Sequence, residues 1–127
     1  MKPTKFIRSN PHLPVRSLRH TLDYYRDNLG FRDEWSFEGL DGGCRRDEMR
    51  LIFGEDPAFT ADINNQGHRL GILWFAENVD ELFEEFRSRG IDIAEPPRDR
   101  AYGGREFTFI DLNGYFIRVA EAFVPPA

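Results

Sequence analysis

The chain has 127 residues, of which 40% are hydrophobic and 31% are charged, and its formal net charge is -5. This length is enough for one domain with a hydrophobic core, and the composition is that of an ordinary soluble globular protein. The acidic balance argues against nucleic acid as a partner. No apolar run reaches the length of a membrane span and the first residues carry no signal-peptide pattern, so we expect a cytoplasmic protein without membrane contact.

The cysteine and aromatic content narrows the possibilities further. Cys44 is the only cysteine, which leaves no partner for an intramolecular disulfide or a cysteine metal cluster. The chain has twelve Phe, four Tyr and two Trp, which together make 14% of its residues. Most large rings belong in a core, but these are more than two small helices are expected to cover. We therefore predict that some of them line a cavity or an oligomer interface.

The first half of the chain predicts one strand, one helix and three further strands. Residues 6–15 form an edge or irregular strand, because Pro11 and Pro14 interrupt it. Ser17 caps a helix whose apolar residues recur at helical spacing as far as Gly30. The three strands that follow are residues 31–37, 44–46 and 49–53, with a turn at residues 39–43.

The second half predicts the same order after a connector at residues 55–67, which is rich in turn-forming residues. Residues 69–76 form a strand. Asn78 then caps a helix, with Glu81 three residues later completing a capping box, and Gly90 ends it. The last strands are residues 91–94, 105–110 and 115–121, with a loop at residues 95–104 and a hairpin turn at residues 111–114.

The two halves also match residue by residue. Leu22 and Tyr25 of the first helix correspond to Phe83 and Phe86 of the second. We therefore predict an α+β fold in which two tandem βαβββ modules form a cupped, largely antiparallel sheet with helices on its outer face. Residues 1–127 are expected to form a single domain, with module 1 at about 6–54, a linker at 55–67 and module 2 at about 68–122.

Three segments resemble the vicinal-oxygen-chelate superfamily, which includes glyoxalase I, extradiol dioxygenases, and fosfomycin and bleomycin resistance proteins. They are Leu13-Pro-Val-Arg-Ser-Leu, Tyr24-Tyr-Arg-Asp-Asn-Leu-Gly-Phe and Asp111-Leu-Asn-Gly, the last being similar to a hallmark Asp-Pro-Asp-Gly turn. The resemblance covers about residues 10–121. It implies paired βαβββ modules and usually a dimer, whereas activity varies among members on the one scaffold.

Catalytic relatives hold a divalent metal with His, Glu or Gln side chains from four strands. The resemblance places these positions at Asn10, Ile52, Gly71 and Arg118. An amide is a poor ligand, an alkyl chain and a bare backbone offer no donor, and a guanidinium repels a cation. His12 shares a face with Asn10 and is the one credible further ligand, whereas His68 points to the opposite face of its strand. We therefore expect no metal, no other cofactor and no catalytic residue.

The open side of the sheet is then expected to bind a ligand. If Arg118 points inward, Phe116 does so too, and a four-residue turn would place Phe107 and Phe109 beside them, although another turn register would reverse this. Trp74 is expected to turn toward the helices. The sequence does not fix the face of Trp35 and Phe37. The predicted ligand-binding residues are Asn10, His12, Trp35, Phe37, Phe75, Tyr102, Phe107, Phe109, Phe116 and Arg118.

Two interpretations of Arg118 stay open. It could anchor an anionic or carbonyl-bearing ligand, or it could pair with an acid such as Glu106. The stretch 95–107, which contains Tyr102, resembles the one that helps to form the ligand groove in bleomycin resistance proteins. The drug bound by that family is cationic, so an inward-facing Arg118 argues against bleomycin itself as the ligand.

These observations favour a non-catalytic protein that binds and sequesters a small, antibiotic-like molecule, similar to bleomycin resistance proteins. We expect a homodimer with two grooves at the subunit interface. The alternative is a metal-dependent enzyme of the same superfamily, either a glyoxalase-type lyase or isomerase or a dioxygenase. A third possibility is a structural or regulatory module whose aromatic face serves only association.

Overall fold

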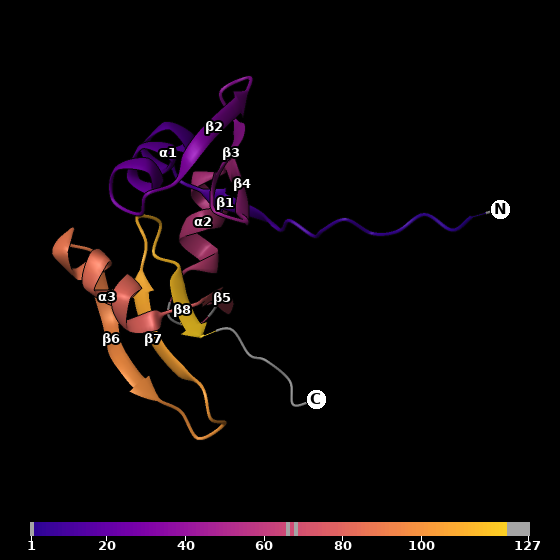
Figure 1. The fold of residues 1–127 in the computed structure, drawn as a ribbon. Coiled ribbons are helices and arrows are strands. Elements are labelled where there is room, and N and C mark those ends of the chain that lie inside the picture. The colour runs from indigo at the N-terminus through magenta and orange to yellow at the C-terminus, as the bar shows by residue number, and fades with distance from the viewer. Residues whose placement is uncertain (1, 66, 68, 122–127) are drawn as a thin grey trace.

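The computed structural model describes residues 2–65, 67 and 69–121. The expected order of strand, helix and three strands occurs twice (Figure 1). The first module contains β1 (His12–Val15), α1 (Leu18–Asp27), β2 (Arg32–Phe37), β3 (Asp41–Arg46) and β4 (Met49–Glu55). Helix α2 (Pro57–Ile63) connects it to the second module, which contains β5 (Ile72–Ala76), α3 (Val79–Ser88), β6 (Asp92–Asp99), β7 (Arg105–Ile110) and β8 (Phe116–Glu121). None of the helices in these residues is long and apolar enough to cross a membrane.

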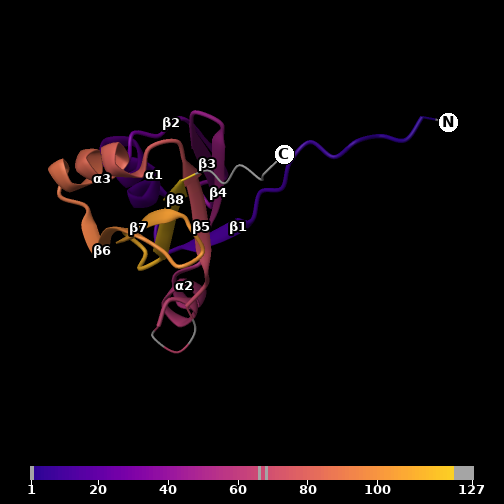
Figure 2. The same ribbon diagram turned by 60° about the horizontal axis from the view of Figure 1, so that its bottom comes forward.

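Each module forms one four-stranded sheet. The strand orders are β1-β4-β3-β2 and β5-β8-β7-β6. The pairs β1–β4 and β5–β8 are parallel and the other pairs are antiparallel. Helices α1 and α3 lie on the same side of the molecule (Figures 1 and 2). The predicted α+β fold of two tandem βαβββ modules is therefore confirmed, with its sheet divided into two halves.

The two helices begin and end at the residues that the sequence indicates. Ser17 Oγ accepts a 3.2 Å hydrogen bond from the His20 backbone N–H, and Asn78 Oδ1 accepts one of 3.0 Å from Glu81 N–H. Gly30 beyond α1 has φ +78°, a conformation that favours glycine and stops a helix. The caps and the stop explain why α1 and α3 have the same length and the same position in their modules.

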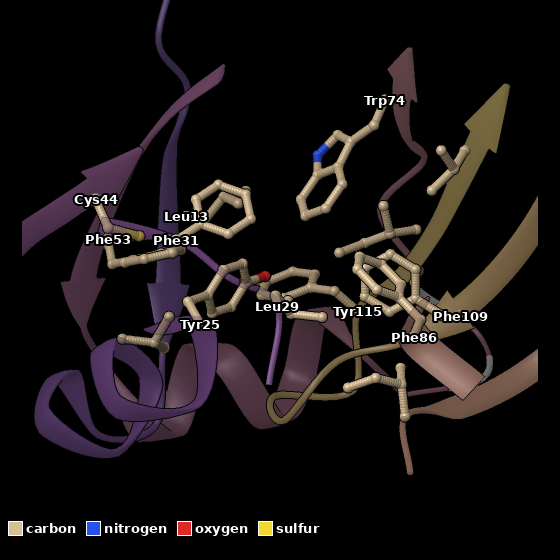
Figure 3. Packing of buried hydrophobic residues seen from close by; sticks show 14 of the residues in the cluster. Leu13, Tyr25, Leu29, Phe31, Cys44, Phe53, Trp74, Phe86, Phe109 and Tyr115 are labelled. Atoms are coloured by element: carbon tan, nitrogen blue, oxygen red, sulfur yellow. The ribbon is translucent and has the colours of Figure 1, made fainter. Parts of the chain in front are cut away.

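The two modules share one hydrophobic core, which Figure 3 shows from close by. Trp74 of β5 contacts rings of both modules, and its ring centroid is 5.9 Å from that of Phe31 and 5.4 Å from that of Phe109. The ring centroid of Tyr25 of α1 is 5.3 Å from that of Phe31 and 5.1 Å from that of Phe53. Tilted and edge-to-face rings at such distances stabilise a core beyond the area that they bury. The prediction that Trp74 turns toward the helices is confirmed.

The N-terminal strand is shorter than predicted. Pairing begins at His12 and not at residue 6, and Phe6 and Ile7 are 102% and 85% exposed. Pro11 has no N–H to donate to a neighbouring strand, which accounts for this start. Both ribbon views show the segment before β1 extending away from the sheets (Figures 1 and 2).

Regular structure also occurs within three segments expected to be turns or connectors. Helix α2 lies within residues 55–67, β3 begins within residues 39–43, and β6 continues into residues 95–104. Asp56 caps α2 by accepting a 3.1 Å hydrogen bond from Phe59 N–H. Gly42 continues β3 because helix α1 packs on it, and a Cβ atom there would lie 3.1 Å from Leu18 Cδ1. Glycine in a strand thus marks a close approach and not a turn.

The hairpin β7–β8 has a different register from the one expected. Asp111 N–H donates a 3.0 Å bond to the Tyr115 carbonyl, so that Ile110 pairs with Phe116. Shifting a register by one residue turns every side chain to the other face. Phe107 and Phe109 are consequently 0% exposed and lie in the core. The prediction that they face the open side of the sheet is wrong.

Candidate functional site

The open face of the first sheet, which we call face A, carries exposed rings. Residues paired across neighbouring strands share a face. His12, Ile52, Gly43 and Trp35 form one such row across β1, β4, β3 and β2. Phe37 lies two residues beyond Trp35. Phe37 is 62% exposed and Trp35 is 47% exposed. Trp35 and Phe37, whose face the sequence did not fix, therefore both lie on face A.

Two glycines make room for the rings of face A. A Cβ atom on Gly43 would lie 2.7 Å from Trp35 Nε1, so the indole rests directly on the backbone of β3. A Cβ atom on Gly54 would lie 2.9 Å from His12 Cε1. His12 Nε2 is 3.2 Å from Asp41 Oδ1, and both side chains are about half exposed. Each glycine thus positions a planar side chain on this surface.

The open face of the second sheet, face B, includes Arg118 and Phe75. Leu73, Arg118 and Thr108 form one row across β5, β8 and β7, and Phe75 lies in the next row. Ile117 and Val119, which alternate with these positions on β8, are 0% exposed and pack in the core. Phe75 is 53% exposed. The predicted facing of Phe75 and Arg118 is confirmed, although no ligand role follows from facing alone.

A buried carboxylate holds Arg118 in place. Glu106 is only 1% exposed, and its Oε1 and Oε2 accept hydrogen bonds of 3.2 and 3.0 Å from Arg118 Nε and Nη2. Tyr102 donates a further 2.7 Å bond to Glu106 Oε2, and Arg100 Nε is 2.8 Å from Oε1. Burial raises the pKa of Glu106, but the bonds from Arg118 and Tyr102 and the charge of Arg100 outweigh it, and the net shift is downward. Arg118 therefore faces the open side and is paired with an ionised acid.

A tight turn places Tyr102 on face B. The Arg100 backbone N–H donates a 2.7 Å bond to the Gly104 carbonyl, which folds residues 100–104 back toward β7. Tyr102 is 61% exposed, and its hydroxyl reaches Glu106. The hydrogen bond to that carboxylate, together with burial, raises the pKa of Tyr102, so the phenol stays protonated at neutral pH.

Beside Arg118 lies a hollow of about 490 Å³. The Arg69 guanidinium covers the Phe116 ring in it, 3.6 Å from the ring centroid. Such a cation–aromatic stack fixes two flexible side chains as one flat surface. The residues lining the hollow are Arg69, Leu70, Gly71, Ile72, Ala94, Glu95, Arg100, Thr108, Phe116 and Arg118.

The positions that hold metal in catalytic relatives do not fit a divalent ion. Asn10 lies before β1, and its Nδ2 donates a 2.9 Å bond to the Arg50 carbonyl while its Oδ1 accepts one of 2.8 Å from Arg8. Ile52 and Gly71 provide no donor atom, and Arg118 is a cation. Within residues 2–65, 67 and 69–121, no three His, Cys, Asp or Glu side chains gather as a metal site would require. His68 lies outside the described residues.

The predicted site residues thus separate into three groups. His12, Trp35 and Phe37 lie on face A, whereas Phe75, Tyr102, Phe116 and Arg118 lie on face B. Asn10 lies before β1, and Phe107 and Phe109 are in the core. The residues of face B that the predicted set omitted are Glu106, Thr108, Arg100 and Arg69. Alternation along β7 would have indicated Glu106 and Thr108 once the register was known.

Paired βαβββ modules, each with one helix-covered and one open sheet face, define the vicinal-oxygen-chelate class of fold. The model of the Glyoxalase/Bleomycin resistance protein/Dioxygenase superfamily matches residues 9–119. The chain belongs to this superfamily. No curated protein matches it.

Solved structures with the same fold include proteins connected with bleomycin. The bleomycin-binding protein from bleomycin-producing Streptomyces verticillus, complexed with copper(II)-bleomycin, is 21% identical with a TM-score of 0.76, over 95% of this chain and 100% of that one. The bleomycin resistance determinant encoded on the transposon Tn5 is 19% identical with a TM-score of 0.73, over 94% and 100%. UcmS2 is 19% identical with a TM-score of 0.76, over 94% and 100%. At such identities the similarity establishes the fold alone.

Proposed function

We propose that this protein binds a small, antibiotic-like molecule without converting it, and so sequesters it in the cytoplasm. One observation carries the proposal. Arg118, at a position where catalytic relatives hold a metal, is a guanidinium fixed by the buried Glu106. A site centred on such an ion pair can recognise a ligand through hydrogen bonds and stacking, but it lacks the donors of a metal centre. The similar fold of two bleomycin-binding or bleomycin resistance proteins supports this function.

The exposed rings supply the contact area for binding. Pockets for small molecules combine apolar and aromatic walls with a few polar anchors. Face B has this composition, with Phe75 and Phe116 beside Arg118 and Thr108. Face A adds Trp35 and Phe37. We expect that a ligand is held by stacking on rings and is oriented by the guanidinium.

A thermal-shift screen of small aromatic compounds tests binding. Compounds that bind should raise the melting temperature of the protein, and they should be recovered chemically unchanged after incubation with it. The variant Phe75→Ala should lose part of this shift. Phe59→Ala is the matched control, because Phe59 is 51% exposed and belongs to helix α2 and not to either sheet, against 53% for Phe75. Turnover of a bound compound would contradict sequestration, and no shift with any compound would favour a module that serves only association.

We further propose a homodimer in which face A of one subunit and face B of the other enclose the ligand. The large rings of both faces are too exposed for a lone subunit to shield a ligand from water. Sedimentation equilibrium should give the mass of a dimer for the intact chain. A chain that is monomeric at every concentration tested, with or without a bound compound, would contradict the shared grooves.

The alternative, a metal-dependent enzyme, rests on the His12–Asp41 pair of face A, whose Nε2 and Oδ1 atoms are 3.2 Å apart. Purified protein should be incubated with nickel, manganese or iron(II), dialysed, and analysed for bound metal. We expect far less than one ion per chain. Tight stoichiometric binding that is lost in His12→Ala and kept in His20→Ala would establish the alternative and refute sequestration without metal. His20 is a suitable control because it is an exposed histidine on α1.

A further inference from the structure

Face B carries more positive than negative charge. Its cations are Arg69, Arg98, Arg100 and Arg118, and its carboxylates are Asp92, Glu95 and Glu106. Four guanidinium groups against three carboxylates leave an excess of one positive charge, in a chain whose net charge is -5. A local charge opposite to that of the whole protein favours an anion at this place.

Arg118 is oriented for such an anion. Its Nε and Nη2 atoms are bonded to Glu106, which is itself almost completely buried. The Arg118 side chain nevertheless remains 50% exposed beside the hollow. A guanidinium already held in one geometry loses little conformational entropy when it binds a carboxylate.

The hollow is also shaped for a planar group. The Arg69 guanidinium and the Phe116 ring form a stack with 3.6 Å between the guanidinium carbon and the ring centroid. Leu70 and Ala94 add apolar walls. The Thr108 hydroxyl lines the same space and makes no hydrogen bond to the described residues, so it can serve a ligand. Flat apolar walls beside a cationic end match a molecule with a ring and an acid.

We infer that the ligand bound at face B is a planar aromatic carboxylate, with its acid group at Arg118 and the edge of Arg69 and its ring beside the Arg69–Phe116 stack, against Leu70. This inference rests on the proposed binding function and adds the chemical class of the ligand. Charge-assisted hydrogen bonds from arginine to a carboxylate are roughly twice as strong as neutral ones. The acid is therefore expected to decide affinity among ligands with the same ring.

Three probes with the same ring test the class by isothermal titration calorimetry: naphthoate, naphthamide and the naphthylmethylammonium ion. Naphthoate should bind at least about tenfold more tightly than the amide, since each charge-assisted bond adds to its affinity. Its affinity should fall as salt is added, whereas that of the amide should not. If the amide or the ammonium ion binds as tightly as naphthoate, the ligand class is wrong and the binding function stands. If none of the three binds, the ligand class is overturned, and the binding function is then decided by the thermal-shift screen.

Matched charge variants locate the site. Arg69→Met should weaken naphthoate binding about tenfold and leave the amide unchanged. Arg105→Met removes the same charge on the other side of the sheet, where Arg105 is bonded to Asp80, and it should have an effect of less than about twofold. Equal losses in both variants would overturn the inference, because they would indicate that naphthoate responds only to the overall charge of the protein and not to a site at Arg69. The double variant Arg118→Met with Glu106→Gln should also lose naphthoate binding, and it leaves no buried carboxylate unpaired.

Discussion

The Tyr25 hydroxyl of α1 donates a 2.7 Å hydrogen bond to Asp111 Oδ2 in the β7–β8 turn, 86 positions later. Asp111 Oδ1 accepts 2.9 Å bonds from the backbone N–H groups of Asn113 and Tyr115. The same carboxylate thus fixes the turn and attaches it to the first module. Because the turn sets the register of β7 and β8, this contact also determines that Glu106 and Arg118 share face B.

Tyr25→Phe removes only the hydroxyl from this contact. We expect the free energy of unfolding to fall by about 1–3 kcal/mol, since Asp111 loses a donor in a buried place. Urea denaturation followed by circular dichroism measures the loss. The control is Tyr24→Phe, because the half-buried Tyr24 forms no hydroxyl bond to the described residues. Equal losses in the two variants would show that the Asp111 contact does not stabilise the fold.

A second contact between the modules joins Arg46 of β3 to Glu85 of α3. Arg46 Nη1 and Nη2 are 2.7 and 2.8 Å from the two carboxylate oxygens of Glu85, and Nη1 also donates to the Leu29 carbonyl at 2.7 Å. Bidentate pairs of this kind that are partly shielded from water contribute more than exposed ones.

Glu85→Gln should therefore lower the free energy of unfolding by about 1 kcal/mol. Glu84→Gln on the same helix breaks only an exposed pair with Arg87 and should cost less than about 0.5 kcal/mol. Denaturation of both variants in the same buffer gives the comparison. A larger loss of unfolding free energy for Glu84→Gln than for Glu85→Gln would show that the inter-module pair stabilises the fold no more than an exposed pair does.

The elements that could be predicted from the sequence are those set by local chemistry. Ser17, Asn78, Gly30 and Gly90 specify where α1 and α3 begin and end, and the apolar spacing between them specifies the buried side. The repeat of this pattern predicted the two modules. None of these features needs knowledge of a distant contact.

The parts of the site that could not be predicted depend on contacts between distant residues. Phe107 lies on the opposite face from the one predicted, because the β7–β8 turn is one residue longer than expected and this exchanges the two faces of the strand. Hydrogen bonds between Asp111 and Tyr115 hold that turn. The position of Trp35 depends on the space above Gly43, and that of Arg69 depends on the Phe116 ring. Alternation alone gives two equivalent faces and does not say which one is open.

Cys44 is expected to resist alkylation in the folded protein. It lies in the core, and burial, with a further contribution from the charge of Glu34, raises the pKa of its thiol to about 12. Only the thiolate reacts, and it is a small fraction of the thiol at pH 8. Mass spectrometry after iodoacetamide treatment should show no adduct in buffer and one adduct in denaturant. Rapid labelling in buffer would mean that the core opens around β3.

The pH dependence of stability should identify Glu106 as an ionised buried acid. Its pKa in the folded protein is below the ordinary value of 4.5, so the folded state binds fewer protons there than the unfolded state. The stabilisation is present above the unfolded value and is lost as the pH falls through the folded one. Glu106→Gln cannot ionise and should be less stable than the natural chain by about 2 kcal/mol at pH 7.

That difference should shrink as the pH is lowered from 5 to about 3, because protonation gives the natural chain a neutral side chain as well. Urea denaturation of both proteins at each pH measures it. A difference that stays constant or grows on acidification would contradict an ionised Glu106. It would then be wrong to treat Arg118 as half of an ion pair, and the excess of positive charge at face B would have to be counted again.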